Sequence, residues 1–177
     1  METKRQQVIL SIDGATKTGW AIYKNGTIVT HGTKRFDSNK RIPQYYKWLS
    51  KIIEENKITH IVGEDIFREH NHTKDNAFYV LSKMQGVLEC VTSLSEIGLT
   101  LLNPLLVKSR MIPSFKRYSR NEDKQRMIER IKALGYQLET EKADDEADAI
   151  GILITYLNEY NLPVTHPKNN LTGPIRR

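Results

Sequence analysis

The chain has 177 residues, of which 38% are hydrophobic and 27% charged, and its formal net charge is +6. This composition is typical of a water-soluble globular domain, and no apolar run approaches the roughly 20 residues that a membrane span needs. The first residues lack the apolar stretch of a signal peptide, so we expect a cytoplasmic protein, or one in the host cytoplasm if a phage encodes it. The single cysteine, Cys90, lies in an apolar helical stretch and is expected in the core.

The first part of the chain predicts a meander of three strands, over 7–13, 18–23 and 27–36. Asn25-Gly26 lies between the second and third and is typical of a tight hairpin. A helix capped by Ser38 or Asn39 is expected to run to about Asn56, followed by an apolar strand over 58–64.

A polar loop over 65–72 leads into the longest predicted helix, 73–96, which Gly98 is expected to end. A strand over 99–102, a basic irregular stretch over 108–120 and two helices, 122–134 and 142–160, complete the pattern; Asn121 is the expected cap of the first. This order predicts an α/β fold in which a mixed five-stranded sheet has helices on both faces. Residues 1–160 are expected to form one domain, and 161–177 a flexible C-terminal tail.

Two acidic residues stand at the ends of predicted strands. Asp13 ends the first strand and Glu64 ends the fourth. If these strands are neighbours and parallel, both carboxylates leave the same edge of the sheet, where ligand sites of open α/β sheets lie. Their mutual repulsion would favour a bound cation. The alternative is that each acid merely begins a turn.

Two further acids begin the last predicted helix. Asp145 and Asp148 are three residues apart and so share a helical face. Acids in a first turn also complement the helix dipole, but Asp148 adjoins a nearly polar-free run and is expected to be buried. Hard oxygen ligands indicate Mg²⁺ or Mn²⁺. Zinc is disfavoured, because the chain has one cysteine and its His70-Asn71-His72 lies in a polar loop.

Basic residues concentrate between Leu105 and Lys132. This segment holds nine Lys or Arg and three acidic residues, a surplus equal to the net charge of the whole chain. Such a concentration favours binding to a polyanion, and the alternative is a solvated basic face.

In chain order, several short motifs resemble those of RuvC-type Holliday-junction resolvases, and the chain is closest in character to phage-type members. They are Ile9-Leu10-Ser11-Ile12-Asp13-Gly14 with Thr18-Gly19, Val62-Gly63-Glu64 with Phe67, Gly86 in the long helix, Pro104 to Lys108, Asp123-Lys124 and Asp145-Glu146-Ala147-Asp148-Ala149. Departures are Ala15 where the family usually has Gly after a Pro, the extra acid Asp65, and a more basic stretch over 110–120.

The resemblance implies an RNase H-like fold, a homodimer and four metal-binding carboxylates, which are Asp13, Glu64, Asp145 and Asp148. It places Lys108 and Lys124 near the cut phosphate or the DNA backbone. Phe67 is expected to stack on an unpaired base, and the alternative is that it caps the core. We therefore expect two Mg²⁺ ions per site, or Mn²⁺, and hydrolysis of a phosphodiester. The residues expected to contact DNA are Phe67, Lys108, Arg110, Lys116, Arg117, Arg120 and Lys124.

The expected function is cleavage of branched DNA such as four-way junctions, in recombination or phage DNA processing. The alternatives are an RNase H-like nuclease that acts on flaps or RNA–DNA hybrids, and a non-catalytic junction-binding protein. The wide apolar stripe of the 73–96 helix, flanked by Phe78 and Tyr79, is the candidate dimer interface. Neither cut position nor sequence preference follows from the sequence.

Overall fold

The computed structural model describes residues 7–14, 17–66, 75–112, 119–140 and 143–167. Five strands form one sheet in the order β3-β2-β1-β4-β5: β1 (Val8–Asp13), β2 (Lys17–Lys24), β3 (Thr27–Arg35), β4 (His60–Glu64) and β5 (Gly98–Leu102). The helices are α1 (Arg41–Asn56), α2 (Asp75–Leu94), α3 (Pro104–Met111), α4 (Arg120–Ala133) and α5 (Asp144–Glu159). None of the described helices is long and apolar enough to cross a membrane.

The sheet is mixed, as predicted. β1 pairs antiparallel with β2, and β2 with β3, whereas β1 and β4 are parallel, as are β4 and β5. Asn25 and Gly26 both have positive φ, which confirms the hairpin between β2 and β3. The parallel pairing of β1 with β4 places the ends of these two strands, and thus Asp13 and Glu64, at the same edge of the sheet.

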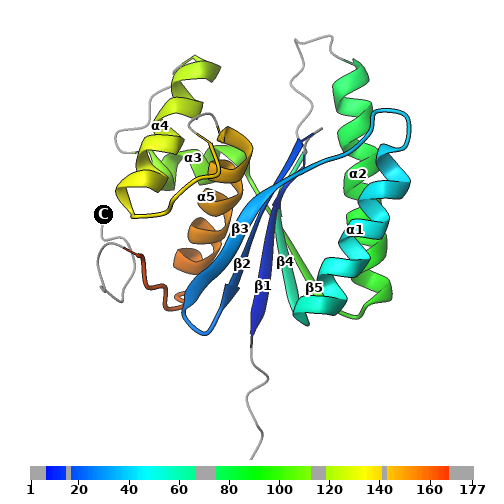
Figure 1. The fold of residues 1–177 in the computed structure, drawn as a ribbon, viewed down its shortest axis with the longest axis horizontal. Helices are drawn as coiled ribbons and strands as arrows, with labels where there is room; N and C mark the ends of the chain where they lie inside the picture. Colours follow the sequence, from blue (N-terminus) through cyan, green and yellow to red (C-terminus); the bar gives the residue numbers. More distant parts are fainter. Residues whose placement is uncertain (1–6, 15–16, 67–74, 113–118, 141–142, 168–177) are drawn as a thin grey trace, which may run out of the picture.

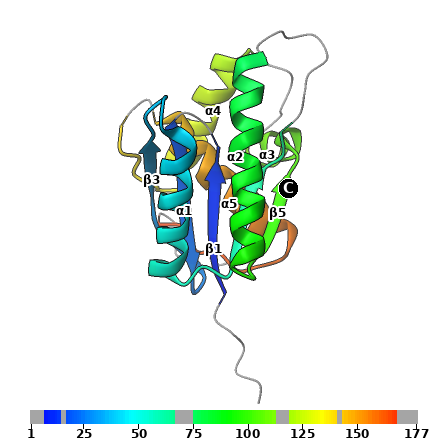
Figure 2. The same cartoon turned by 90° about the vertical axis from the view of Figure 1, so that its right-hand side faces the viewer.

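Helices cover both faces of the sheet. Figure 1 shows α1 and α2 on one face and α3, α4 and α5 on the other; Figure 2 looks onto the first face, where α1 lies toward β3 and α2 toward β5. β1 is buried on both sides, with Ile9 in one core and Leu10 and Ile12 in the other. A strand covered on both faces is apolar at successive positions, which explains the unbroken run of β1.

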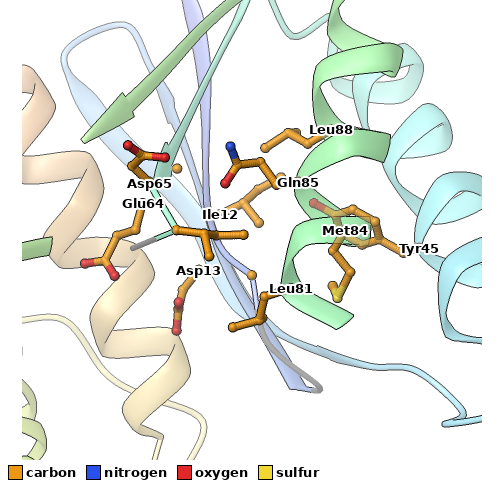
Figure 3. A pocket seen from close by; sticks show the side chains of 12 residues that line it. Ile12, Asp13, Tyr45, Glu64, Asp65, Leu81, Met84, Gln85 and Leu88 are labelled. Atoms are coloured by element: carbon orange, nitrogen blue, oxygen red, sulfur yellow. The ribbon is translucent and has the colours of Figure 1, made fainter. Parts of the chain in front are cut away.

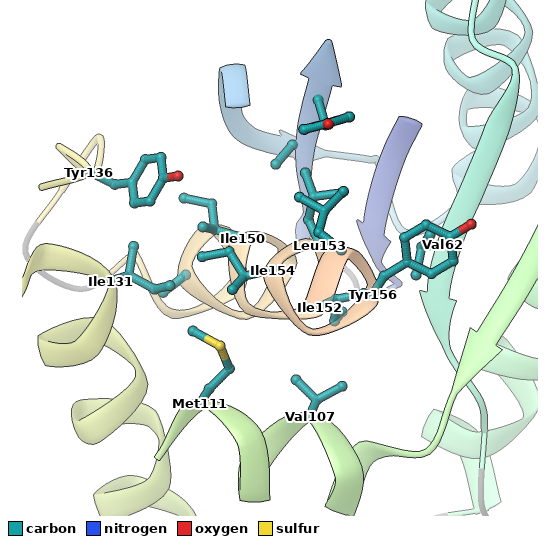
Figure 4. Packing of buried hydrophobic residues seen from close by; sticks show 14 of the residues in the cluster. Val62, Val107, Met111, Ile131, Tyr136, Ile150, Ile152, Leu153, Ile154 and Tyr156 are labelled. Atoms are coloured by element: carbon teal, nitrogen blue, oxygen red, sulfur yellow. The ribbon is translucent and has the colours of Figure 1, made fainter. Parts of the chain in front are cut away.

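The helix α5 is the centre of one core. Its residues from Ala149 to Leu157 are all buried, and Val107 and Met111 of α3 lie beneath it (Figure 4). The hydroxyl of Ser11 in β1 donates a hydrogen bond of 2.7 Å to the backbone oxygen of Ala149, and Ser11 itself is fully buried. This bond fixes the start of α5 against β1.

Three local predictions were wrong. The stretch over 108–120 that was expected to be irregular begins inside α3, which starts at Pro104 behind the capping side chain of Asn103. Ser119 caps α4 in place of Asn121, through a reciprocal pair of bonds with Glu122. The first turn of α1 starts after Lys40 without a side-chain cap, so neither Ser38 nor Asn39 has that role.

Two further expectations need correction on the α2 side. Cys90 is exposed rather than buried, because it lies on the face of α2 opposite Met84, Leu88 and Val91. The chain leaves α2 through Glu96, which has a left-handed φ of 53°, and Gly98 already belongs to β5. A side chain at position 98 would collide with the ring of His60.

The segment 161–167 lies against the body of the protein. Val164 is fully buried, and the ring of the buried His166 lies 3.0 Å from the hydroxyl of Tyr136. Thr165 forms a parallel bridge with Thr27 at the start of β3. This part of the expected tail is therefore packed; 168–177 lie outside the described residues.

Candidate active site

Three separate elements bring carboxylates to one edge of the sheet. Asp13 ends β1, Glu64 ends β4, and the first turns of α5 carry Asp145 and Asp148. Figure 3 shows the side chains of Asp13 and Glu64 on the side of the sheet that α5 covers. The charges of Asp148, Glu64 and Asp145 all act on Asp13, so the four predicted acids form one cluster.

The acids of this cluster are partly buried, and each resists ionisation. Burial raises the pKa of Asp13 well above its ordinary value, and the charges of Asp148, Glu64 and Asp145 raise it further. Burial raises the pKa of Glu64 to about 7, against the opposing charge of Lys108. The pKa of Asp148 also rises to about 7, through burial and then the charge of Glu64. Burial followed by the charge of Asp144 raises the pKa of Asp145.

This arrangement fits a divalent cation. Burial and mutual repulsion make the ionised cluster costly, and a bound cation would offset both effects. Its donors are all carboxylate oxygens, the ligands that Mg²⁺ and Mn²⁺ prefer. The described residues contain no group of three His, Cys, Asp or Glu side chains already gathered as a metal cage. The carboxylates thus lie near one another without forming a closed coordination shell.

Lysine side chains lie around the cluster. Lys124 of α4 forms an ion pair with Asp144, and its pKa is raised because this bond and the charges of Asp144, Asp145 and Asp148 outweigh its burial. The amine of Lys108 lies 2.9 Å from the carboxylate of Asp123. Both predicted lysines therefore stand beside the site, each held by an acid.

Several residues expected to bind DNA lie elsewhere or outside the description. Arg110 forms a 2.7 Å ion pair with Glu159, which by helix rise is about 16 Å along α5 from Asp148. Phe67, Lys116 and Arg117 lie outside the described residues, as does the side chain of Arg120. The structure thus unites the four acids with Lys108 and Lys124 and leaves Arg110 apart.

Sequence reasoning missed four charged residues at the site. The amine of Lys17 lies 3.9 Å from the carboxylate of Asp145, and Arg35 also lowers the pKa of Asp145. Asp144 and Asp123 are the partners of the two predicted lysines. Asp144 had a visible signal in the acidic run before α5, and Asp123 had one in the Asp123-Lys124 motif. The others depend on pairing between strands and helices that no local pattern reveals.

A cavity of about 220 Å³ adjoins the cluster on the α2 side. Asp13 and Glu64 lie on one wall and Leu81, Met84 and Gln85 of α2 on the other, as Figure 3 shows. Asp65, the acid that departs from the family pattern, also lines it. The cavity thus opens between β1, β4 and α2, beside the strand ends that carry Asp13 and Glu64.

The sheet order, the two helical layers and the acids at the ends of β1 and β4 define an RNase H-like α/β protein with an acidic site. No family model matches the sequence. The chain is 27% identical over 165 residues to a crossover junction endodeoxyribonuclease RuvC of Syntrophomonas wolfei, which covers 87% of this chain and 90% of the relative.

Solved structures agree in fold. The Thermus thermophilus RuvC in complex with a Holliday junction substrate superposes with a TM-score of 0.66 at 13% identity, covering 96% of this chain and 99% of that one. The fowlpox virus resolvase in complex with substrate Holliday junction DNA gives 0.59 at 15% identity, covering 87% and 99%. The predicted fold and the resemblance to RuvC-type resolvases are both confirmed.

Proposed function

We propose that this protein is a divalent-metal-dependent endonuclease that cleaves branched DNA, with the four-way junction as its main substrate. One observation carries the proposal: four carboxylates meet at one edge of the sheet, those of Asp13, Glu64, Asp145 and Asp148. The fold that holds them is the fold of RuvC proteins, which are named as crossover junction endodeoxyribonucleases. A cluster of buried carboxylates has no evident structural value, because its mutual repulsion destabilises the fold. Such an enzyme acts in the cytoplasm, of a cell or of the host of a phage.

The four carboxylates hold the metal in this proposal, with Mg²⁺ as the physiological ion and Mn²⁺ as a substitute. Two bound ions would activate the attacking water and offset the charge that develops on the leaving oxygen. Asp13 and Glu64 are fixed by the sheet, and Asp148 by the buried helix α5, so the ligands are set by rigid elements. The backbone positions of these donors are therefore set in advance, and metal binding would require their side chains to draw together.

The lysines beside the cluster supply positive charge for the phosphate. Lys124 faces the carboxylates from α4, and Lys108 is near enough to lower the pKa of Glu64. Either amine can offset charge on the phosphate during cleavage. The remaining predicted contacts, Arg110, Lys116, Arg117 and Arg120, bind the DNA backbone, and Phe67 stacks on an unpaired base at the branch.

The active form is a symmetric dimer in this proposal. Resolution of a four-way junction needs two cuts in strands of like polarity, and a two-fold dimer places two sites equivalently. One flank of α2 exposes apolar surface to solvent, since Phe78 and Tyr79 are 37% and 61% exposed. This flank is separate from the face of α2 that packs on the sheet through Met84, Leu88 and Val91.

Cleavage of synthetic substrates in Mg²⁺ tests the function. A four-way junction, a flap, an RNA–DNA hybrid and a plain duplex of matched sequence are compared, with Asp13→Asn as the inactive control. We expect paired, symmetric nicks in the junction and little cutting of the duplex. Preferred cutting of the hybrid or the flap would favour the alternative nuclease. Tight junction binding without any cleavage would favour a non-catalytic junction-binding protein.

A further inference from the structure

A second and larger hollow lies between α1 and the β2–β3 hairpin. Its volume is about 690 Å³, and it is separate from the carboxylate cavity. The strands contribute Trp20, Lys34 and Arg35 to its lining, and α1 contributes Lys47, Trp48 and Lys51. We call this hollow the α1–β3 groove. Nothing in the carboxylate chemistry accounts for it.

Aromatic rings form part of the lining of the groove. Trp20 and Trp48 are half-buried, so each indole is only partly covered. Phe36 is buried and supports Trp48, with ring centroids 5.8 Å apart. Tyr45 lies 6.0 Å from Trp48 and 5.6 Å from Phe36 between ring centroids, so the three rings pack against one another. The indole of Trp48 is thus held in place by neighbouring rings, which makes it a preformed surface for a flat ligand.

Basic side chains surround these rings. Lys34, Arg35, Lys47 and Lys51 line the groove against a single acid, Glu55, which is paired with Lys51 at 3.6 Å. Lys34 and Lys47 have no carboxylate partner among the residues that the structure describes. Aromatic faces combined with a basic groove are the means by which proteins bind single-stranded nucleic acid without reading its sequence.

The groove leads toward the acidic site. Arg35, at its end, is the cross-strand partner of Lys17, and the amine of Lys17 lies 3.9 Å from the carboxylate of Asp145. Basic side chains therefore connect the α1–β3 groove with the carboxylate cluster. They pass around the open end of the β2–β3 hairpin, where β2 begins and β3 ends. A DNA strand that leaves the cluster along this path would enter the groove.

We propose that the α1–β3 groove binds a single-stranded segment of the DNA substrate, with bases on the two indoles and phosphates on the lysines. This inference rests on the proposed function for the source of the strand, but its binding chemistry is independent of cleavage. An acidic protein segment is the competing occupant. The strand is favoured because the groove offers flat indoles beside several cations and adjoins a site that fits a phosphodiester.

The chain contains two tryptophans, and both line the groove, so intrinsic fluorescence reports on it directly. The probe is an oligothymidylate of about 10 nucleotides, titrated into the full-length protein in EDTA so that no cleavage occurs. Stacked bases should quench the emission to saturation. Trp20→Phe and Trp48→Phe each leave one reporter, and both should retain part of the quenching.

The salt dependence identifies the phosphate contacts. The double variant Lys47→Gln, Lys51→Gln removes two exposed cations, and glutamine keeps a comparable helix propensity. If both bind phosphates, the slope of log affinity against log salt should flatten by about 1.4, from about 0.7 per contact on a single strand. Lys83→Gln is the control, because Lys83 is exposed on α2, outside both the groove and the basic segment 105–132. Its slope should equal that of the unaltered protein.

Three results would overturn the inference. The first is binding of a labelled oligonucleotide, seen by anisotropy, without any change in tryptophan emission. The second is an equal flattening of the slope in Lys83→Gln, which would show a long-range charge effect. The third is tighter binding of an acidic peptide with one phenylalanine than of the oligonucleotide. Each can occur while junction cleavage is intact, so failure here is distinguishable from failure of the proposed function.

Discussion

The main chain of Asp145 lies directly against Gly19 of β2. A β-carbon built at Gly19 would stand 1.7 Å from the backbone oxygen of Asp145, far closer than any real contact. The first turn of α5 can therefore approach the sheet only because this position lacks a side chain. The close approach brings the acids of α5 toward Asp13, so one glycine sets the spacing of the cluster.

Gly19→Ala should therefore displace the start of α5. We expect a loss of about 1–3 kcal/mol in the free energy of unfolding, or more, as for other overpacked cores, together with loss of metal-dependent cleavage. Gly86→Ala is the control, because a β-carbon there meets nothing within 4 Å. That change lies inside α2 and should stabilise the protein by about 0.5–1 kcal/mol. Equal denaturant midpoints for the two variants would refute the packing argument.

The carboxylates should separate catalysis from binding. Asp13→Asn or Asp148→Asn removes a metal ligand and also a negative charge that repels phosphate. Cleavage of a four-way junction should vanish, whereas binding should persist or tighten in a gel-shift assay. Asp37→Asn, an exposed change in the connection before α1, should leave both unchanged. Robust cutting by Asp13→Asn in Mg²⁺ would remove Asp13 from the site.

The raised pKa values predict how stability varies with pH in the absence of metal. Glu64 and Asp148 have pKa values of about 7 in the folded protein, against ordinary values of 4.5 and 3.8. Between pH about 4 and about 7, Glu64 and Asp148 are ionised in the unfolded chain but still protonated in the folded protein. The contribution of these two acids to the free energy of unfolding therefore falls as the pH rises through this interval, and it is constant above about pH 7. In EDTA the melting temperature should decline over this interval more in the unaltered protein than in Asp148→Asn.

Metal binding should reverse this loss. At pH 8 the acids are ionised, and Mg²⁺ should raise the melting temperature of the unaltered protein, because it binds only the folded state. The increase should shrink at pH 6, where protons compete for the same oxygens. Asp148→Asn should show little increase at either pH. An increase in Asp148→Asn equal to that of the unaltered protein would place the metal elsewhere.

The proposed dimer depends on the exposed flank of α2. Tyr79→Glu introduces a charge at a side chain that is 61% exposed, so the monomer should still fold. If this flank forms the contact, sedimentation at micromolar concentration should show a monomer and paired cutting should become single nicks. Tyr46→Glu is the matched control, since Tyr46 is 49% exposed on α1. Dissociation by both variants, or by neither, would exclude this interface.

The elements that position the site were predictable because their signals are local. The apolar run before Asp13, the run before Glu64 and the polar-free stretch after Asp148 each gave an element and its end. The helix α3 was not predicted, although Asn103-Pro104 is typical of a helix start. The exposure of Cys90 and the packing of 161–167 depend on which faces find partners, and no short pattern encodes that.

The carboxylates come from three segments of the chain, and the last of them, α5, follows every strand of the sheet. During synthesis on the ribosome, a nascent chain has Asp13 and Glu64 long before it has Asp148. The acidic cluster cannot be complete until all five strands and α5 have emerged and α5 has docked between β1 and α3. In a nascent chain that ends before Asp148, the proposed metal site therefore lacks ligands and should have no capacity for cleavage.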